Sequence, residues 1–125
     1  MTVLLGFDYG KRRTGVAIGN RISGSARPLK ILHSDDQDKL LALIAPFITD
    51  WQPSALVVGL PTHPDGAAHA MTLAARQFAA ALTQQFGLPV WLMDERYSSV
   101  EAGGDDAAAA AVILQRYLDE HADAA

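Results

Sequence analysis

The chain contains no cysteine among its 125 residues, which excludes a disulfide scaffold, a zinc-thiolate site and a cysteine nucleophile. It also lacks any apolar run near the roughly 20 residues that a membrane-spanning helix needs. Basic residues are in the minority, because 10 lysines and arginines stand against 14 aspartates and glutamates, for a formal net charge of −4. A chain with this balance does not coat nucleic acid as a general polycation, so binding to nucleic acid requires a local basic patch and metal ions.

What the chain does have is enough apolar material for a folded domain. Half of its residues are hydrophobic and 19% are charged, which excludes a disordered tail or a low-complexity linker. The length predicts one domain over residues 1–125, which hides about two-thirds of its unfolded surface. The first five residues lack the basic region of a secretory signal peptide, so we expect a cytoplasmic protein that does not bind membranes.

The hydrophobic periodicity predicts eight elements in the order βββαβαβα. Period-two and continuous apolar segments predict strands at 3–7, 14–18, 26–32, 54–60 and 89–93. Helical spacing predicts helices after Asp35-Asp36, from about 67 to 86, and from about 106 to 120. We expect Pro46 to kink or end the first helix near Ala45, Gly87 to cap the second, and residues from Gln115 onward to fray.

This order predicts an α/β fold with a mixed five-stranded sheet. The first three strands form an antiparallel meander, and the first, fourth and fifth strands run parallel. Right-handed crossovers then put helices on both faces of the sheet. In sheets of this kind, binding sites form beyond the carboxyl ends of the parallel strands.

Acidic residues occur where those strand ends meet. Asp8 ends the first strand, Asp94 and Glu95 end the fifth, and Asp105 and Asp106 begin the last helix. Converging carboxylates repel one another unless a cation lies among them, and Mg²⁺ or Mn²⁺ suits oxygen ligands. Two such ions about 4 Å apart can activate a water and stabilise the leaving oxygen of a phosphodiester.

Each acidic residue also has a simpler structural interpretation. Asp8 can belong to a turn with Tyr9 and Gly10, and Asp94 and Glu95 can be solvated loop charges. Asp105 fits the N-cap of the last helix, which leaves Asp106 to point into the cleft. Ser98 and Glu101 have the spacing of a capping box, so both are interpreted as structural.

Basic residues lie close to the candidate acids in the sequence. Lys11, Arg12 and Arg13 follow Asp8, and Arg96 follows Glu95. Five of the ten basic residues fall within positions 11 to 27, where Arg21 and Arg27 complete the set. These side chains can hold phosphates on either side of a cut, or they can be the solvated tip of a hairpin.

The histidine, tryptophan and tyrosine side chains are mostly interpreted as structural. The four histidines have no metal-ligand spacing. Trp51 and Trp91 fit the core or its rim better than a stacking platform for bases. Tyr9 is the exception, because it is next to Asp8 and so remains a candidate for the site.

Four segments, in order, resemble motifs of the YqgF/RuvX family. They are GFDYGKRRTGVA at 6–17, VVGLP at 57–61 with Asp65-Gly66, DERYSSVEA at 94–102, and Asp106 before ILQ at 113–115. The resemblance covers roughly positions 3 to 120. It implies a ribonuclease H-like fold related to RuvC-type Holliday junction resolvases, and a bacterial cytoplasmic nuclease assigned to 5′-end maturation of pre-16S rRNA. It also implies that Asp8, Glu95 and Asp106 bind the metal.

The chain departs from the family pattern between the third motif and the last aspartate. Only Gly103, Gly104 and Asp105 separate Ala102 from Asp106, where the family has a longer connector that contains lysine. The choice between Asp105 and Asp106 as ligand therefore stays open. Whether the short connector is natural or engineered also stays open.

Four functions remain in competition at this point. The first is a two-metal nuclease that acts on structured RNA, and the second is a resolvase of branched DNA, which usually acts as a homodimer. The third is the ATP-binding half of an actin-like fold, which needs a second such domain that the chain lacks. The fourth is a nucleic-acid-binding module that has lost catalysis. The oligomeric state, monomer or homodimer, stays open.

Overall fold

The computed structural model describes residues 2–60, 70–94 and 106–121. Within these ranges the order of elements is the predicted one. The elements are β1 (Val3–Asp8), β2 (Arg13–Asn20), β3 (Ser25–His33), α1 (Gln37–Trp51), β4 (Ala55–Leu60), α2 (Ala70–Phe86), β5 (Val90–Asp94) and α4 (Asp106–Glu120).

The five strands form one mixed sheet with the spatial order β3-β2-β1-β4-β5. β2 is antiparallel to both β1 and β3, whereas β4 is parallel to both β1 and β5. The predicted meander and the predicted parallel set are therefore confirmed. Asp8 ends β1, and the paired residues Leu60 and Asp94 end β4 and β5, so the carboxyl ends of the parallel strands share one edge.

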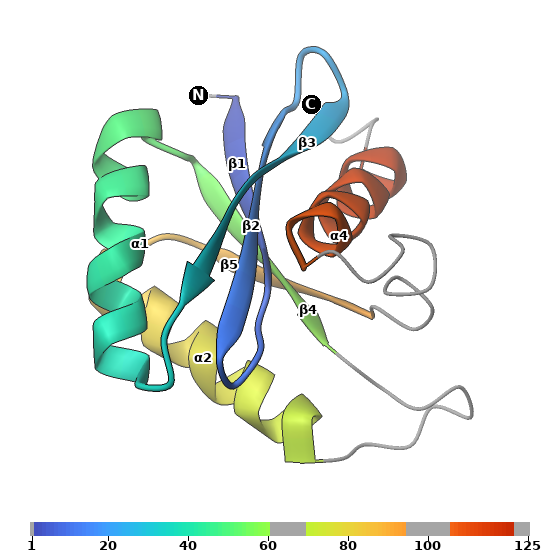
Figure 1. Cartoon of the computed structure of the whole chain (residues 1–125). Helices are drawn as coiled ribbons and strands as arrows, with labels where there is room; N and C mark the ends of the chain where they lie inside the picture. Colours follow the sequence, from blue (N-terminus) through green and yellow to red (C-terminus); the bar gives the residue numbers. More distant parts are fainter. Residues whose placement is uncertain (1, 61–69, 95–105, 122–125) are drawn as a thin grey trace.

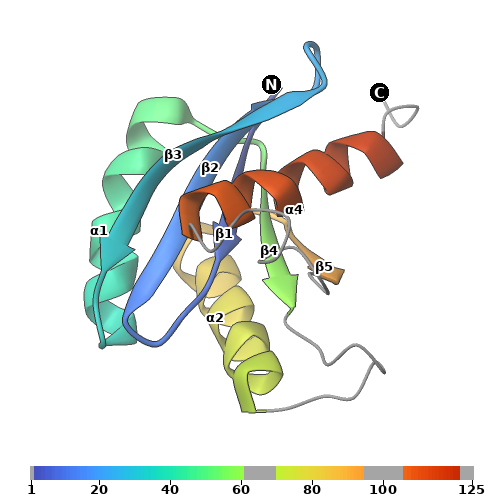
Figure 2. The same cartoon turned by 45° about the vertical axis from the view of Figure 1, so that its right-hand side comes forward.

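Helices cover both faces of the sheet, as expected. Figure 1 and Figure 2 show α1 and α2 on one face and α4 on the other. Because side chains alternate along a strand, β1 contributes side chains to the hydrophobic core on each face of the sheet. Leu5 and Phe7 pack with the α1 and α2 side chains, and Leu4 packs with Leu114 of α4.

Helix α1 begins as predicted but ends later than predicted. The Asp36 carboxylate caps it by accepting from the backbone N–H of Asp38 at 2.8 Å. Pro46 does not end the helix, which continues to Trp51. Pro46 is exposed, so water can reach the carbonyl it leaves unpaired, and the apolar stripe of α1 packs on the core on both sides of it.

Of the predictions for the ends of α2 and α4, the first is confirmed and the second is wrong. Gly87 follows α2 with a φ of +67°, and its N–H donates to the Thr83 carbonyl, which is the predicted left-handed cap. Fraying over residues 115–120 is wrong, because α4 stays helical to Glu120, while residues 122–125 lie outside the described ranges. The Gln115 side chain holds the β2–β3 hairpin there, accepting from the Ala26 N–H at 2.9 Å and donating to the Gly24 carbonyl at 2.8 Å.

Glycines on β1 and β2 let α4 approach the sheet closely. A Cβ on Gly15 would lie 1.9 Å from the backbone oxygen of Asp106, and one on Gly6 would lie 2.8 Å from the Leu114 Cβ. A Cβ on Gly19 would meet only ends of side chains, with Leu114 Cδ2 at 2.9 Å. The backbone of α4 therefore rests on β2 most tightly at its first turn.

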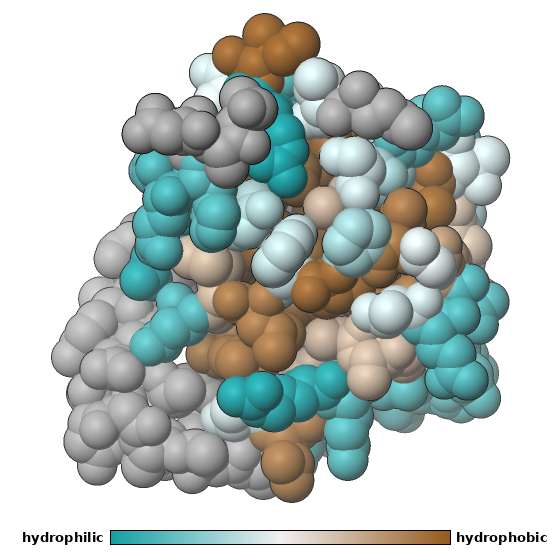
Figure 3. Space-filling model, turned by 180° about the vertical axis from the view of Figure 1, so that it is seen from behind, coloured by the Kyte–Doolittle hydropathy of each residue, from teal (hydrophilic) through white to brown (hydrophobic). Residues whose placement is uncertain are grey.

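The edge strand β5 leaves apolar side chains at the surface. Trp91 and Leu92 are both exposed, and apolar residues gather on the side of the molecule seen in Figure 3. None of the helices in the described part of the chain has the length and apolar character that crossing a bilayer requires.

The substitution Gly15→Ala tests the contact between α4 and β2. Because the new Cβ meets backbone, the helix must shift, and we expect a loss of about 1–3 kcal/mol in the free energy of unfolding. Gly19→Ala is the matched control, since its Cβ meets the side chains of Leu114 and Leu118 rather than backbone, so we expect a smaller loss. Urea unfolding measures both, and equal losses in the two variants would contradict this packing.

Candidate active site

Asp8 lies at the carboxyl end of β1 on the face that α4 covers. Gly6, two residues earlier, faces α4, and alternation puts position 8 on the same side. Asp8 pairs in register with Gly15 of β2. The sequence places this carboxyl at a strand end, and the sheet turns it toward the helix.

Asp106 comes to the same place from the other end of the chain. It is the first residue of α4, and its backbone oxygen lies over Gly15, the register partner of Asp8. The close contact at Gly15 therefore brings position 106 beside position 8. The backbone positions of these two acids are therefore neighbours, and the convergence of their carboxylates on one cation stays a prediction.

Arg13 holds the side chain of Asp106. Its Nε lies 3.1 Å from Asp106 Oδ2, with the arginine side chain 61% exposed and the aspartate side chain 23% exposed. Arg13 and Gly15 share a face of β2 because they are two residues apart. The ion pair is exposed on the arginine side, so it orients the carboxylate more than it stabilises the fold.

A basic pocket of about 570 Å³ opens beside this pair. Three consecutive cationic side chains line it, and a phosphate is the natural ligand for arginine and lysine in this arrangement. The full lining is Gly10, Lys11, Arg12, Arg13, His33 and Asp106.

His33 is the pocket residue that the sequence interpretation missed. It ends β3 and pairs with Arg13 across the hairpin, which puts both on the α4 face. Counting back from the hairpin turn gives this pairing approximately, but a bulge between Val16 and Ala17 shifts the register. The sequence alone therefore did not single His33 out.

Two further arginines of the meander lie away from Asp8. Arg21 donates to the Tyr117 hydroxyl at 3.3 Å and lies over its ring, beside the first residues of β1. Arg27 pairs with Ile18, whose side chain belongs to the core on the other face of the sheet. Neither one lines the basic pocket.

Tyr9 packs rather than facing the acids. Its ring stacks on Phe78 of α2 at a centroid distance of 4.7 Å. It therefore lies on the face of the sheet opposite to Asp106.

The candidate site residues Glu95, Arg96 and Asp105 fall outside the described ranges, as do Ser98 and Glu101, which were interpreted as structural. Asp94 is described, is exposed and ends β5. Met93 packs in the α4-side core, so alternation puts Asp94 on the other face. In residues 2–60, 70–94 and 106–121, no three histidine or acidic side chains form a group that could hold a metal ion.

Comparison with known proteins gives a consistent relationship over nearly the whole chain. Residues 2–120 match the model of the RuvX family, described as a Holliday junction resolvase. A protein of Paraburkholderia xenovorans is 47% identical, with 96% of this chain and 90% of the relative covered, and is named "Putative pre-16S rRNA nuclease". A Paraburkholderia phymatum protein of the same name is 48% identical over 93% of this chain and 84% of the relative.

Solved structures give the same fold at low sequence identity. RuvC of T. thermophilus in complex with a Holliday junction substrate has a TM-score of 0.66 at 14% identity, covering 97% of this chain and 96% of that one. The fowlpox virus resolvase bound to junction DNA has a TM-score of 0.61 at 12% identity, with 94% and 97% covered. The RuvC-like fold is thus shared, and on the family match and the close curated relatives the chain belongs to the RuvX family.

Proposed function

We propose that this protein is a divalent-metal-dependent nuclease that hydrolyses phosphodiester bonds in the precursor of 16S rRNA. The observation that carries the proposal is the backbone of Asp106 lying over Gly15, the register partner of Asp8, beside a pocket lined by Lys11, Arg12 and Arg13. The substrate is inferred from relatives that are 47–48% identical and are named "Putative pre-16S rRNA nuclease".

The donor set at this point fits a hard divalent cation. Asp8 and Asp106 offer carboxylate oxygens, which Mg²⁺ and Mn²⁺ prefer. Glu95 is proposed as a third acidic ligand of the same cation. A metal bound by these residues would supply the activation of water and the stabilisation of the leaving oxygen.

The residues of the chain position the substrate. Lys11, Arg12 and Arg13 follow Asp8 and line the pocket, so a phosphate held there lies next to the acids. Arg13 also orients the Asp106 carboxylate through the 3.1 Å contact. Arg96, directly after Glu95, is proposed to contact substrate from the other side.

A resolvase of branched DNA is the second candidate. The family description and the RuvC-like fold favour it. The two candidates differ in substrate and in assembly, because a junction with two-fold symmetry calls for a symmetric dimer. Cleavage of a pre-16S rRNA fragment by a monomer, with a four-way DNA junction left intact, would select the RNA nuclease.

Asp8→Asn tests the catalytic proposal. Loss of one carboxylate ligand is expected to lower the cleavage rate about a thousand-fold, because metal-ion catalysis supplies several kcal/mol. Thermal stability should stay equal or rise, since the neutral amide relieves repulsion between neighbouring carboxylates. The measurement is cleavage of a labelled pre-16S rRNA fragment with Mg²⁺ or Mn²⁺ and an EDTA control. A variant that cuts as fast as the parent in Mn²⁺ would overturn the proposal.

A pair of variants decides which of the two neighbouring aspartates acts. Asp106 lies over Gly15, so Asp106→Asn is expected to abolish cleavage with little loss of stability. Asp105 is proposed as the N-cap of α4 on its residue type, so Asp105→Ala is expected to cost about 1 kcal/mol of stability with cleavage retained. Cleavage assays and thermal melting on both variants give the answer, and the reverse pattern would assign the ligand to Asp105.

A further inference from the structure

The positive charge of the chain is concentrated in one hairpin. Residues 9–34 contain six lysines and arginines and no aspartate or glutamate, although the whole chain has a net charge of −4. This segment comprises β2, β3 and the turns that flank them. Three of its cationic residues line the basic pocket at Asp106, and Lys30 and Arg27 lie further along β3.

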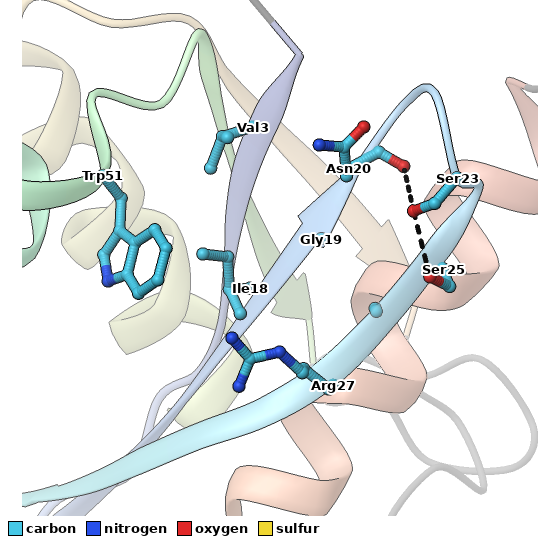
Figure 4. Close-up of a pocket in the computed structure, with 9 residues that line it drawn as sticks. Val3, Ile18, Gly19, Asn20, Ser23, Ser25, Arg27 and Trp51 are labelled. Atoms are coloured by element: carbon cyan, nitrogen blue, oxygen red, sulfur yellow. Dashed lines mark hydrogen bonds between the residues drawn. The ribbon is translucent and has the colours of Figure 1, made fainter.

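A second pocket, of about 260 Å³, lies along this hairpin on the α1 face of the sheet. Figure 4 shows the guanidinium of Arg27 and the indole of Trp51 turned toward the same space beside Ile18. The full lining is Val3, Ile18, Gly19, Asn20, Ser23, Ser25, Ala26, Arg27 and Trp51.

Arg27 offers an available positive charge in this pocket. Its side chain is exposed, and within the described part of the chain its guanidinium makes no ion pair. Its register partner Ile18 faces the core on the α1 side, which turns Arg27 to that side as well. A guanidinium in this position can bind a phosphate through two parallel hydrogen bonds.

Trp51 offers an aromatic surface in the same pocket. It is the last residue of α1, and it is 38% exposed. The carboxyl end of a helix carries partial negative charge, which disfavours a phosphate beside Trp51. The two ends of the pocket therefore suit different parts of one ligand, with an anion at Arg27 and an uncharged ring at Trp51.

The wall of the pocket is held in place from the opposite face. Gln115 of α4 bonds to the backbone of Gly24 and Ala26, and Arg21 bonds to the Tyr117 hydroxyl. Ser23 and Ser25 are linked by a 3.0 Å hydrogen bond between their hydroxyls. The hairpin end is thus fixed before any ligand binds, which lowers the entropic cost of binding.

We propose that this pocket binds one nucleotide of single-stranded RNA, with the phosphate on Arg27 and the base stacked on Trp51. The inference rests on the proposed function, because the strand would be a flank of the substrate. Arg27 lies opposite Ile18, five positions along β2 from Arg13, or about 17 Å. Because Arg13 lies on the α4 face and Arg27 on the α1 face, a strand that reaches both must pass round the β3 edge, so it needs more than the about five nucleotides that a stacked strand spans over this distance.

Binding of a 12-nucleotide single-stranded RNA tests the pocket. All proteins carry Asp8→Asn, so that no cleavage occurs during the titration. Trp51→Ala is expected to weaken binding at least about five-fold, which is the low end for loss of one base stack. Arg27→Gln should weaken binding and lower the slope of log affinity against log salt by about one. Arg76→Gln, an exposed arginine on α2, is the matched control and should change binding much less.

Tryptophan fluorescence reports the stack directly. Trp91→Phe leaves Trp51 as the single tryptophan, and the same RNA should then quench the emission. Trp51→Phe keeps an aromatic ring and should recover most of the affinity lost in Trp51→Ala, which separates stacking from a folding defect.

The possible results separate this proposal from its premise. RNA bound with the same affinity by the Arg27, Trp51 and Arg76 variants, with no quenching of Trp51, would overturn the pocket and leave the nuclease proposal standing. In that case a protein partner would be the better occupant. No binding of this RNA by any form of the chain would also overturn the pocket, whereas the nuclease proposal is overturned only by the cleavage assay on the pre-16S rRNA fragment.

Discussion

The contact between the first turn of α4 and Gly15 is the constraint on which the rest of the site depends. Only a residue without a Cβ lets the backbone oxygen of Asp106 come so close to β2. Gly15 is also the register partner of Asp8, so the contact brings together two acids separated by almost one hundred residues. The Arg13 ion pair then fixes the direction of the second carboxylate.

Much of this arrangement follows from the sequence. The alternation of apolar residues predicted all eight elements, the antiparallel meander and the parallel set, because hydrophobic periodicity and crossover handedness are strong constraints. The rule that parallel strands end at one edge placed Asp8 at that edge, and the roles of Asp8 and Asp106 as metal ligands stay predictions. The Glu95 part of that prediction lies outside the described residues and stays a prediction.

Other features could not be predicted, for reasons that lie in tertiary packing. Helix α1 continues past Pro46 because its apolar stripe packs on the core both before and after this residue, which local propensity does not reveal. Gln115 is polar and near the end of the chain, yet it bonds to a hairpin about ninety residues away. Trp51 fitted a place in the core or at its rim, and only the fold shows that it shares a pocket with Arg27. In each case the deciding partner is distant in sequence.

The most direct test of the central claim is where a paramagnetic ion binds. Amide resonances of the isotope-labelled protein would be followed by NMR during addition of Mn²⁺ at less than one equivalent. If Asp8 and Asp106 form one cation site, the amides of Asp8, Gly15 and Ala107 broaden first, while those of Gly24 and Trp51 stay sharp. Broadening spread over the exposed acids, with these three amides unaffected, would contradict a shared site.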